Sequence, residues 1–288
     1  MKPPVFEYHR PASADEAVAL LASLGEDAKL LAGGQSLVAM MNFRLARPTA
    51  LVDISRLDEL RFVRRDNGSL LVGALARHRD LEFPSDPATF DGFSVLPRAA
   101  RQIGHYVIRQ SGTFGGSIAH ADPAAEWCMV ALLLDAEIGV LGPEGTRRTV
   151  PADGFFQGFL MTDLAADEMI VDVRLSGAFP HAGFQEFARR HGDFAVVAAG
   201  AALSMDGGTV KDARVVLGGV GGAPVRSAAA EELLRGADAG PGAFRAAADA
   251  AASEIDPPAD LQGSPEYRRQ LAAVLVRRAL EEAVAGDD

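Results

Sequence analysis

Hydrophobic and polar residues recur along the chain with spacings that predict both helices and short strands. Near the amino terminus, Ser13 and Glu16 have the spacing of a capping box, and apolar residues then fall on one face of a predicted helix until Gly25 ends it. Residues 62–72 predict a β-hairpin, because the Asn67-Gly68 dipeptide readily adopts the positive φ angles of a tight turn. The first part of the chain therefore mixes helices with strands.

The second part of the chain has a different order of elements. Residues 195–203 and 214–220 are strand-like apolar runs with a glycine turn between them. Helical patterns then follow at residues 228–234, 244–255 and 265–284. This order predicts an α+β protein with a division near residues 176–181.

Composition narrows the possible classes of protein. The 288 residues are 48% hydrophobic and 23% charged, which is typical of a globular chain, and apolar runs such as residues 127–134 are too short to span a membrane. The first ten residues lack the order of a signal peptide, so we expect a cytoplasmic protein. The net charge of −11 argues against nucleic-acid binding. Cys128, the only cysteine, cannot form an internal disulfide or hold an iron–sulfur cluster alone, and we expect a buried core residue.

Two glycine segments are the main candidates for ligand binding. The first is Gly33-Gly34-Gln35-Ser36 and the second is Thr113-Phe114-Gly115-Gly116-Ser117. Glycine permits positive φ and close approach of the backbone, and successive free N–H groups can point at phosphate oxygens. The two segments therefore predict a shared diphosphate site, whereas each alone is also compatible with an ordinary turn.

Four longer strings, two of which contain these segments, carry a family resemblance. They are AGGQSL, the block with the pattern IGxxxIRxxGTxGGSxxxADPAAE, DEMIVDVRL and FQEFARRHGDFAVV. In content, order and spacing the chain resembles, over nearly its whole length, the FAD-binding medium subunit of the molybdenum hydroxylases. This is the family of xanthine dehydrogenase and aerobic carbon monoxide dehydrogenase.

The resemblance implies a fold and a domain division. It implies a two-lobed α+β FAD-binding fold of the vanillyl-alcohol oxidase and p-cresol methylhydroxylase type, with lobes at residues 1–56 and 57–176. Residues 177–288 would form a carboxy-terminal domain with a three-stranded antiparallel sheet and helices.

The resemblance also implies which residues contact a non-covalent FAD. Amides and hydroxyls of both segments would hold the diphosphate, and Glu126 would accept hydrogen bonds from the sugar portion. The acid at Glu126 is alternatively explained by the dipole of the helix that it begins, and Asp122 by a helix N-cap. The full set of implied cofactor contacts is Ala32, Gly33, Gly34, Gln35, Ser36, Leu37, Ile103, Gly104, Thr113, Gly115, Gly116, Ser117, His120, Asp122, Glu126 and Ile170.

One position departs from the family pattern. Several relatives have a lysine near the flavin just after the residue that corresponds to Phe187, and this chain has Ala188 there. Arg189 or Arg190 would be the replacement for that positive charge.

The function implied by the resemblance is electron transfer within a larger assembly. A large subunit would carry molybdopterin, a small subunit would carry two [2Fe–2S] clusters, and the assembly would be a dimer of heterotrimers. This chain would hold FAD and contribute no catalytic side chain and no metal ligand. Two alternatives remain open at this point: a free-standing flavoprotein oxidase, and a scaffold subunit without flavin.

Overall fold

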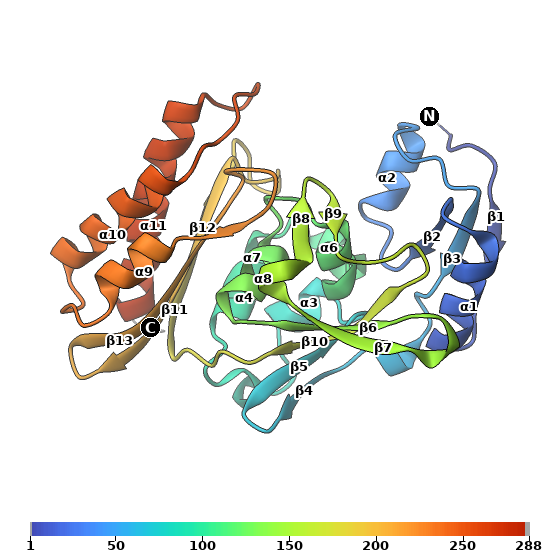
Figure 1. Cartoon of the computed structure of the whole chain (residues 1–288), viewed down its shortest axis with the longest axis horizontal. Coiled ribbons are helices and arrows are strands. Elements are labelled where there is room, and N and C mark those ends of the chain that lie inside the picture. Colours follow the sequence, from blue (N-terminus) through green and yellow to red (C-terminus); the bar gives the residue numbers. More distant parts are fainter. Residues whose placement is uncertain (1, 286–288) are drawn as a thin grey trace.

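Three main sheets and a two-stranded hairpin make up the β-structure in the computed structural model, which describes residues 2–285. Figure 1 shows an amino-terminal lobe, a middle lobe and a carboxy-terminal domain arranged in this order along the longest axis of the molecule. The mixed α/β architecture expected from the sequence is confirmed. The vanillyl-alcohol oxidase type of the fold and the domain limits at residues 56 and 176 stay predictions.

The amino-terminal lobe contains a parallel three-stranded sheet. Its central strand is β3 (Ala50–Asp53), flanked by β1 (Glu7–His9) and β2 (Ala28–Leu31). Helix α1 (Ala14–Leu24) joins β1 to β2 and begins as predicted, with the Ser13 side chain accepting a hydrogen bond from the amide of Glu16. A short helix, α2 (Leu37–Asn42), follows β2 and begins next to the first glycine segment.

The middle lobe is built on a five-stranded antiparallel sheet, which lies below a layer of helices in Figure 1. The predicted hairpin at its edge is confirmed, since Asn67 and Gly68 have φ of 50° and 85°. In sheet order its strands are β4 (Val63–Asp66), β5 (Ser69–Gly73), β10 (Met169–Leu175), β6 (Glu137–Leu141) and β7 (Arg147–Pro151). The helices are α3 (His78–Glu82), α4 (Val95–Gln102), α5 (Tyr106–Ser111), α6 (Phe114–His120), α7 (Glu126–Leu133) and α8 (Ala152–Phe155).

A small hairpin and several single turns complete this lobe. The hairpin consists of β8 (Phe156–Gly158) and β9 (Met161–Thr162). The 3₁₀ turns in the described part of the chain are Asp58–Leu60, Pro87–Phe90 and Pro143–Gly145. Cys128 lies fully buried in α7, as expected of a core residue.

The carboxy-terminal domain is a sheet with helices on one face. Its strands are β11 (His181–Phe187), β12 (Val197–Asp206), β13 (Thr209–Gly218) and β14 (Val225–Arg226). The sheet therefore has four strands instead of the expected three, because two residues after Pro224 return to the edge of β13. The helices, α9 (Ala228–Leu234), α10 (Pro241–Glu254) and α11 (Pro265–Ala285), confirm the three predicted helical segments.

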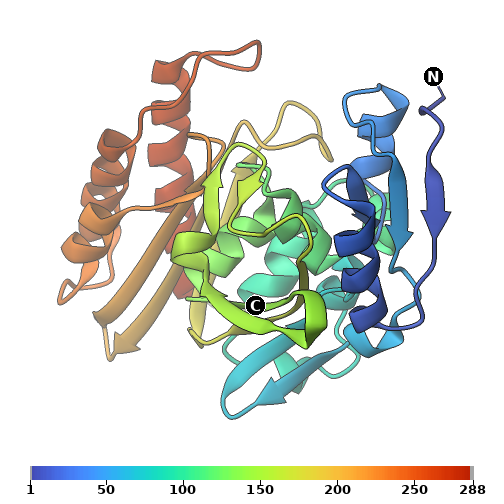
Figure 2. The same ribbon diagram turned by 45° about the vertical axis from the view of Figure 1, so that its right-hand side comes forward.

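The two faces of this carboxy-terminal sheet pack against different parts of the chain. One face packs on α9 and α11, with α10 packed against these two helices, and the other faces α4 and α7 of the middle lobe, as Figures 1 and 2 show. Residues from β11, β12 and β13 consequently belong to the same hydrophobic cluster as the middle lobe. The domains thus share buried side chains across their boundary.

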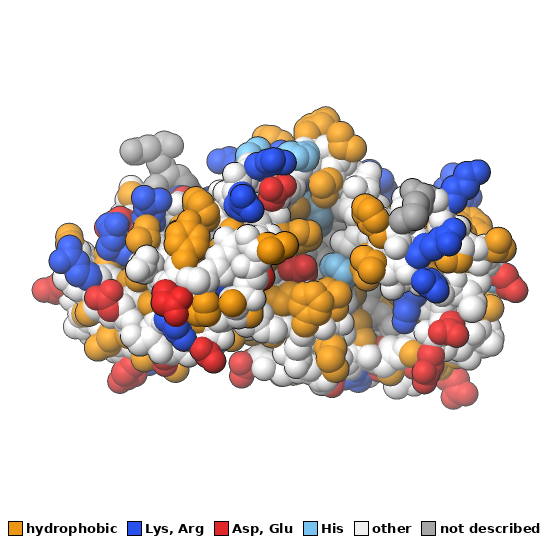
Figure 3. Space-filling view, turned by 90° about the horizontal axis from the view of Figure 1, so that it is seen from above, with side chains coloured by type: hydrophobic (Ala, Val, Ile, Leu, Met, Phe, Trp, Pro, Cys, Tyr) orange, Lys and Arg blue, Asp and Glu red, His pale blue; other side chains and the backbone are white. Residues whose placement is uncertain are grey.

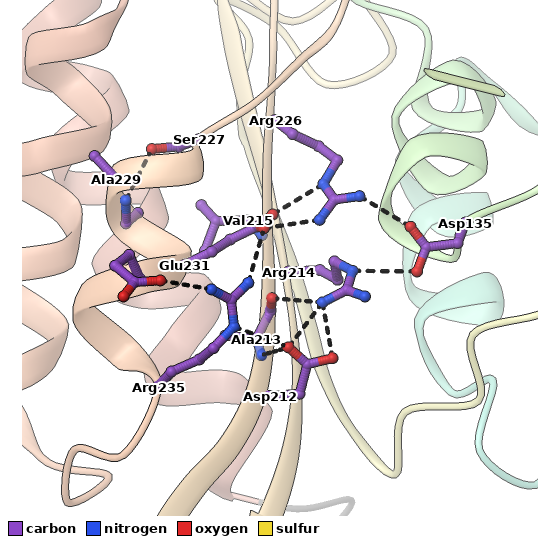
Figure 4. Close-up of polar contacts among 12 residues, drawn as sticks. Asp135, Asp212, Ala213, Arg214, Val215, Arg226, Ser227, Ala229, Glu231 and Arg235 are labelled. Carbon is purple, nitrogen blue, oxygen red and sulfur yellow. Dashed lines mark hydrogen bonds and ion pairs between the residues drawn. The ribbon is translucent and has the colours of Figure 1, made fainter. Parts of the chain in front are cut away.

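Ion pairs also cross this boundary, at a position away from the glycine segments. Asp135, which follows α7, accepts hydrogen bonds from Arg214 at 3.1 Å and from Arg226 at 2.9 Å (Figure 4). Arg226 further forms a bidentate pair with Glu231 of α9. Opposite charges therefore help to hold the middle lobe against the carboxy-terminal sheet. None of the helices within residues 2–285 combines the length and apolar character needed to cross a bilayer.

Candidate cofactor site

The first glycine segment forms the turn between β2 and α2. Gly34 has φ of +71°, a conformation that favours glycine. Among the described residues, no acceptor receives a backbone hydrogen bond from the amides of residues 33–36, and the Gln35 side chain donates to the Gly33 carbonyl at 3.1 Å. Four consecutive amide donors are therefore available to a ligand.

A cavity of about 490 Å³ lies beside this segment, where β2 and β3 end. The cavity includes four of the residues expected to bind the cofactor and six that the sequence did not indicate. Its lining consists of Leu31, Ala32, Gly33, Gly34, Gln35, Val38, Ala39, Asn42, Asp53 and Ser55. Seen from above, the surface is hollowed between the amino-terminal lobe and the middle of the molecule, and hydrophobic, histidine and acidic side chains gather in the hollow (Figure 3).

Asp53 is the charged residue of this lining. Burial opposes its ionisation, but hydrogen bonds from the Tyr8 hydroxyl and from Ser55, together with Arg10, outweigh that effect and lower the pKa of Asp53. The carboxylate is thus held in place by its neighbours in the amino-terminal lobe. An aspartate at the end of an apolar strand is the sequence signal by which it could have been found.

The second glycine segment differs from the expected loop. Thr113 caps α6, and Gly115, Gly116 and Ser117 form the first turns of that helix. The amide of Gly115 donates to the Ala74 carbonyl at 2.9 Å, that of Gly116 to the Thr113 hydroxyl at 3.2 Å, and that of Ser117 to the Thr113 carbonyl at 3.0 Å. Each of these three amides thus has an acceptor within the protein, and their expected contact with a phosphate stays a prediction.

The two segments nevertheless lie against each other. A Cβ atom added to Gly33 would lie 2.3 Å from the Ser111 carbonyl oxygen and 2.8 Å from the Gly112 Cα. A Cβ added to Gly116 would lie 3.9 Å from the Cβ of Ala32. The fold thus brings the first segment onto the residues that introduce the second, which is the proximity that a shared site requires.

Acidic residues lie at the start of α7. Glu126 is its first residue, as predicted, and is half-buried. Burial, with Glu186 as the second cause, raises the pKa of Glu126 to about 8. Asp122 accepts a hydrogen bond from the amide of Ala124 at 2.9 Å, whereas the N-cap position of α7 is Ala125. Asp122 therefore stabilises the turn before the helix instead of capping it.

The remaining predicted contacts are distributed around the middle lobe. Ile103 is buried at the end of α4, and Arg109 donates to the carbonyls of Ile103 and Gly104, at 3.0 Å each. Ile170 is buried in β10. Burial lowers the pKa of His120, at the end of α6, against an opposing effect of Asp122.

The two arginines considered as a replacement for the lysine of relatives, and possible metal ligands, complete the set of predicted features. Arg189 and Arg190 are exposed in the connection between β11 and β12, so a role at the flavin stays a prediction for both. Within the described residues, no group of three or more His, Cys, Asp or Glu side chains has an arrangement that could hold a metal ion.

Comparison with known proteins assigns both halves of the chain. Residues 4–176 match the family described as FAD binding domain in molybdopterin dehydrogenase, and residues 182–283 match the CO dehydrogenase flavoprotein C-terminal domain. The carbon monoxide dehydrogenase medium chain of Hydrogenophaga pseudoflava is 39% identical over 99% of both chains. The nicotine 6-hydroxylase medium subunit of Paenarthrobacter nicotinovorans is 38% identical, also over 99% of both chains.

A solved structure extends this agreement to three dimensions. A chain of quinoline 2-oxidoreductase from Pseudomonas putida 86 is 36% identical and superimposes with a TM-score of 0.93 over 99% of both chains. Sequence and structure therefore agree over essentially the whole length. The chain contains an FAD-binding domain and belongs to the family of FAD-binding medium subunits of molybdenum hydroxylases.

Proposed function

We propose that this chain is the electron-transfer subunit of a molybdenum hydroxylase. It would accept electrons from [2Fe–2S] clusters on a small subunit and pass them to an external acceptor, while a large subunit with molybdopterin oxidises the substrate. The observation that supports this role best is the row of four amides without acceptors at residues 33–36, next to the cavity at the ends of β2 and β3. The proposed assembly is a dimer of such heterotrimers.

The residues present fit FAD at its anionic end. The amides of residues 33–36 would bind the diphosphate through their N–H dipoles, because they have no acceptor among the described residues and border the cavity. No lysine or arginine lines the cavity, so these dipoles would provide most of the stabilisation of negative charge. The second segment would hold the first segment in place. Gly115 of its helix packs on Ala74 of the middle lobe, and the residues just before this helix, Ser111 and Gly112, lie against Gly33.

The residues also fit the rest of the cofactor. Glu126, when ionised, can accept hydrogen bonds from sugar hydroxyls. When bound, FAD would supply a redox group that is stable at both one-electron and two-electron levels, which suits transfer from single-electron clusters to a two-electron acceptor. The task of this chain would be to bind and orient that group.

The direct test is the cofactor content and reactivity of the purified chain, alone and in complex with its partner subunits. We expect about one FAD per chain, released by mild acid because it is not covalently attached, and reduced by dithionite. A colourless chain that fails to bind added FAD would contradict the proposal. Oxidation of an alcohol, amine or sugar by the isolated chain at roughly 1 per second or faster would instead support the free-standing oxidase.

A further inference from the structure

Helix α5 connects two parts of the predicted cofactor site. It begins after the turn at Ile103 and Gly104, which are both predicted cofactor contacts, and it ends at Ser111. Ser111 and the next residue, Gly112, lie against Gly33 of the first glycine segment, at 2.3 Å and 2.8 Å from an added Cβ. The position of α5 therefore determines how the turn and the first glycine segment lie relative to each other.

Apolar burial contributes little to the position of this helix. Each of the six residues of α5 keeps some exposure to solvent, whereas seven of the eight residues of α7 are buried. A helix of this length is not stable by itself, and one without a buried face gains little from the hydrophobic effect. Other contacts must therefore hold α5 in place.

Polar contacts from α3 and the residue before it hold the end of α5. Arg77 donates a hydrogen bond to the backbone carbonyl of Gln110, and Arg79 donates one to the side-chain oxygen of the same residue. The amide of His78 donates to the Gly112 carbonyl at 3.1 Å. The end that lies against the first glycine segment is thus attached to α3 at several points.

A buried ion pair joins Glu82 of α3 to Arg109 of α5. Nε of Arg109 donates to the Glu82 carboxylate at 2.7 Å, and the side chains of Arg109 and Glu82 are 12% and 6% exposed. Nη1 of the same guanidinium donates to the carbonyls of Ile103 and Gly104, at 3.0 Å each. Because the guanidinium carries several donors in one rigid plane, this single side chain ties α3 to the turn before α5.

A comparable ion pair lies at the boundary with the carboxy-terminal domain. Arg226 forms a bidentate pair with Glu231, whose side chain is 5% exposed, and it also donates to Asp135 (Figure 4). The two pairs thus match in chemistry and in the burial of the acid. They differ in what else the arginine holds, since only Arg109 binds the carbonyls of predicted cofactor contacts.

We propose that Arg109 is a positioning residue of the cofactor site and that Glu82 orients it. This inference rests on the proposed function. Arg109 fixes the turn at Ile103 and Gly104 in the conformation that receives FAD, and neither Arg109 nor Glu82 needs to touch the cofactor. A site that is ordered before binding avoids the free-energy cost of ordering it during binding. Loss of this bridge should therefore weaken FAD binding and change the surroundings of the bound flavin.

Arg109→Lys is the first test. Lysine keeps a positive charge near Glu82, but its ammonium group lacks the planar set of donors that serves the carboxylate and both carbonyls at once. FAD is titrated by fluorescence into the deflavinated full-length chain, well below its melting temperature, and visible circular dichroism of the bound flavin is recorded at saturation. We expect the dissociation constant to rise roughly 3- to 10-fold and the dichroism to change.

Arg226→Lys is the matched control, because it weakens an ion pair of similar burial in the same way. Both variants should lower the melting temperature, and only Arg109→Lys should change FAD affinity and the dichroism. Wild-type values of both FAD measurements in Arg109→Lys, or equal losses of affinity in the two variants, would overturn the inference. A wild-type chain that fails to bind FAD would instead contradict the proposed function itself.

Variants of Glu82 test the orienting role separately, and they decide the matter if Arg109→Lys fails to fold. Glu82→Gln keeps an acceptor oxygen for Nε of Arg109, whereas Glu82→Ala removes it. FAD affinity should therefore decrease in the order wild type, Glu82→Gln, Glu82→Ala, with a loss of several-fold for the alanine variant. Partial rescue by glutamine would support orientation of Arg109 through a hydrogen bond. FAD affinity and dichroism of wild type in Glu82→Ala would show that the turn does not depend on this pair.

Discussion

The two glycine segments have similar sequences but different hydrogen bonding and surroundings. In the first, the amides of residues 33–36 have no acceptor in the described structure, and the segment borders the cavity. In the second, the amides of Gly115, Gly116 and Ser117 donate to Ala74 and Thr113, and the segment is the start of α6. A glycine can therefore expose the backbone to a ligand in one place and permit tight packing in another.

This difference supports the proposal that the first segment binds the anion and that the second holds the first in position. Because Gly33 lies against Ser111 and Gly112, the support is transmitted by direct backbone contact. Variants in each segment should consequently differ in whether they reduce cofactor binding or stability.

The largest effect is expected from Gly33→Val. The added Cβ would lie 2.3 Å from the Ser111 carbonyl oxygen, a backbone atom that cannot rotate away. The first segment must then leave its place, and we expect FAD retention to be lost, as measured by flavin absorbance of the purified chain. Gly242→Val in α10 is the matched control, because no heavy atom outside its own helix lies within 4 Å of an added Cβ. Normal FAD content in Gly33→Val would show that contact between the segments is not required.

A stability effect is expected from Gly115→Val. Its Cβ would lie 2.6 Å from that of Ala74, so the helix would have to shift from the end of β5. Overpacking of this kind costs about 1–3 kcal/mol. We expect a lower melting temperature of the apo chain, while the fraction that folds retains most of its FAD affinity. Complete loss of FAD binding at an unchanged melting temperature would place the second segment in direct contact with the phosphates.

Glu126→Ala tests whether the carboxyl group at the start of α7 contributes to FAD affinity. Loss of one or two charge-assisted hydrogen bonds to the cofactor should weaken FAD affinity roughly 10- to 100-fold, by fluorescence titration of the apo variant. Glu126→Gln, which keeps an acceptor, should lose less. If Glu126 served only the dipole of α7, the melting temperature would fall and the affinity would stay unchanged.

Much of the fold could be predicted because its signals are local. The capping box at Ser13, the Asn67-Gly68 hairpin and the helices of the carboxy-terminal domain depend on neighbouring residues, and all are confirmed. The start of α6 was missed because glycine pairs disfavour helices by propensity. Thr113 as N-cap and the packing on Ala74 override that preference, and the packing depends on a residue far away in the sequence.

Site residues that the sequence did not indicate were missed for the same reason, because contacts between distant parts of the chain bring them to the site. Asp53 and Ser55 reach the cavity because β2 and β3 pair in parallel, which joins strands separated by a helix. Sequence patterns indicate which face of an element a residue occupies, whereas tertiary packing decides what that face meets.

The smallest expected effect comes from Gly34→Ala, and it isolates the ligand-facing role of the first segment. Gly34 has φ of +71°, so any Cβ introduces strain of roughly 1–2 kcal/mol, and its nearest neighbours would be side-chain atoms of Leu31 and Val38 at 3.2 Å. Gly68→Ala is the matched control, because Gly68 has φ of +85° with nothing within 4 Å and lies in the distant hairpin. Both variants should lose similar stability in chemical unfolding of the apo chain. Only Gly34→Ala should also weaken FAD, by a few-fold, since its strain tilts amides that have no acceptor other than the ligand. Equal FAD affinity in the two variants would mean that these amides do not hold the cofactor, and the contrast between the two glycine segments would lose its functional meaning.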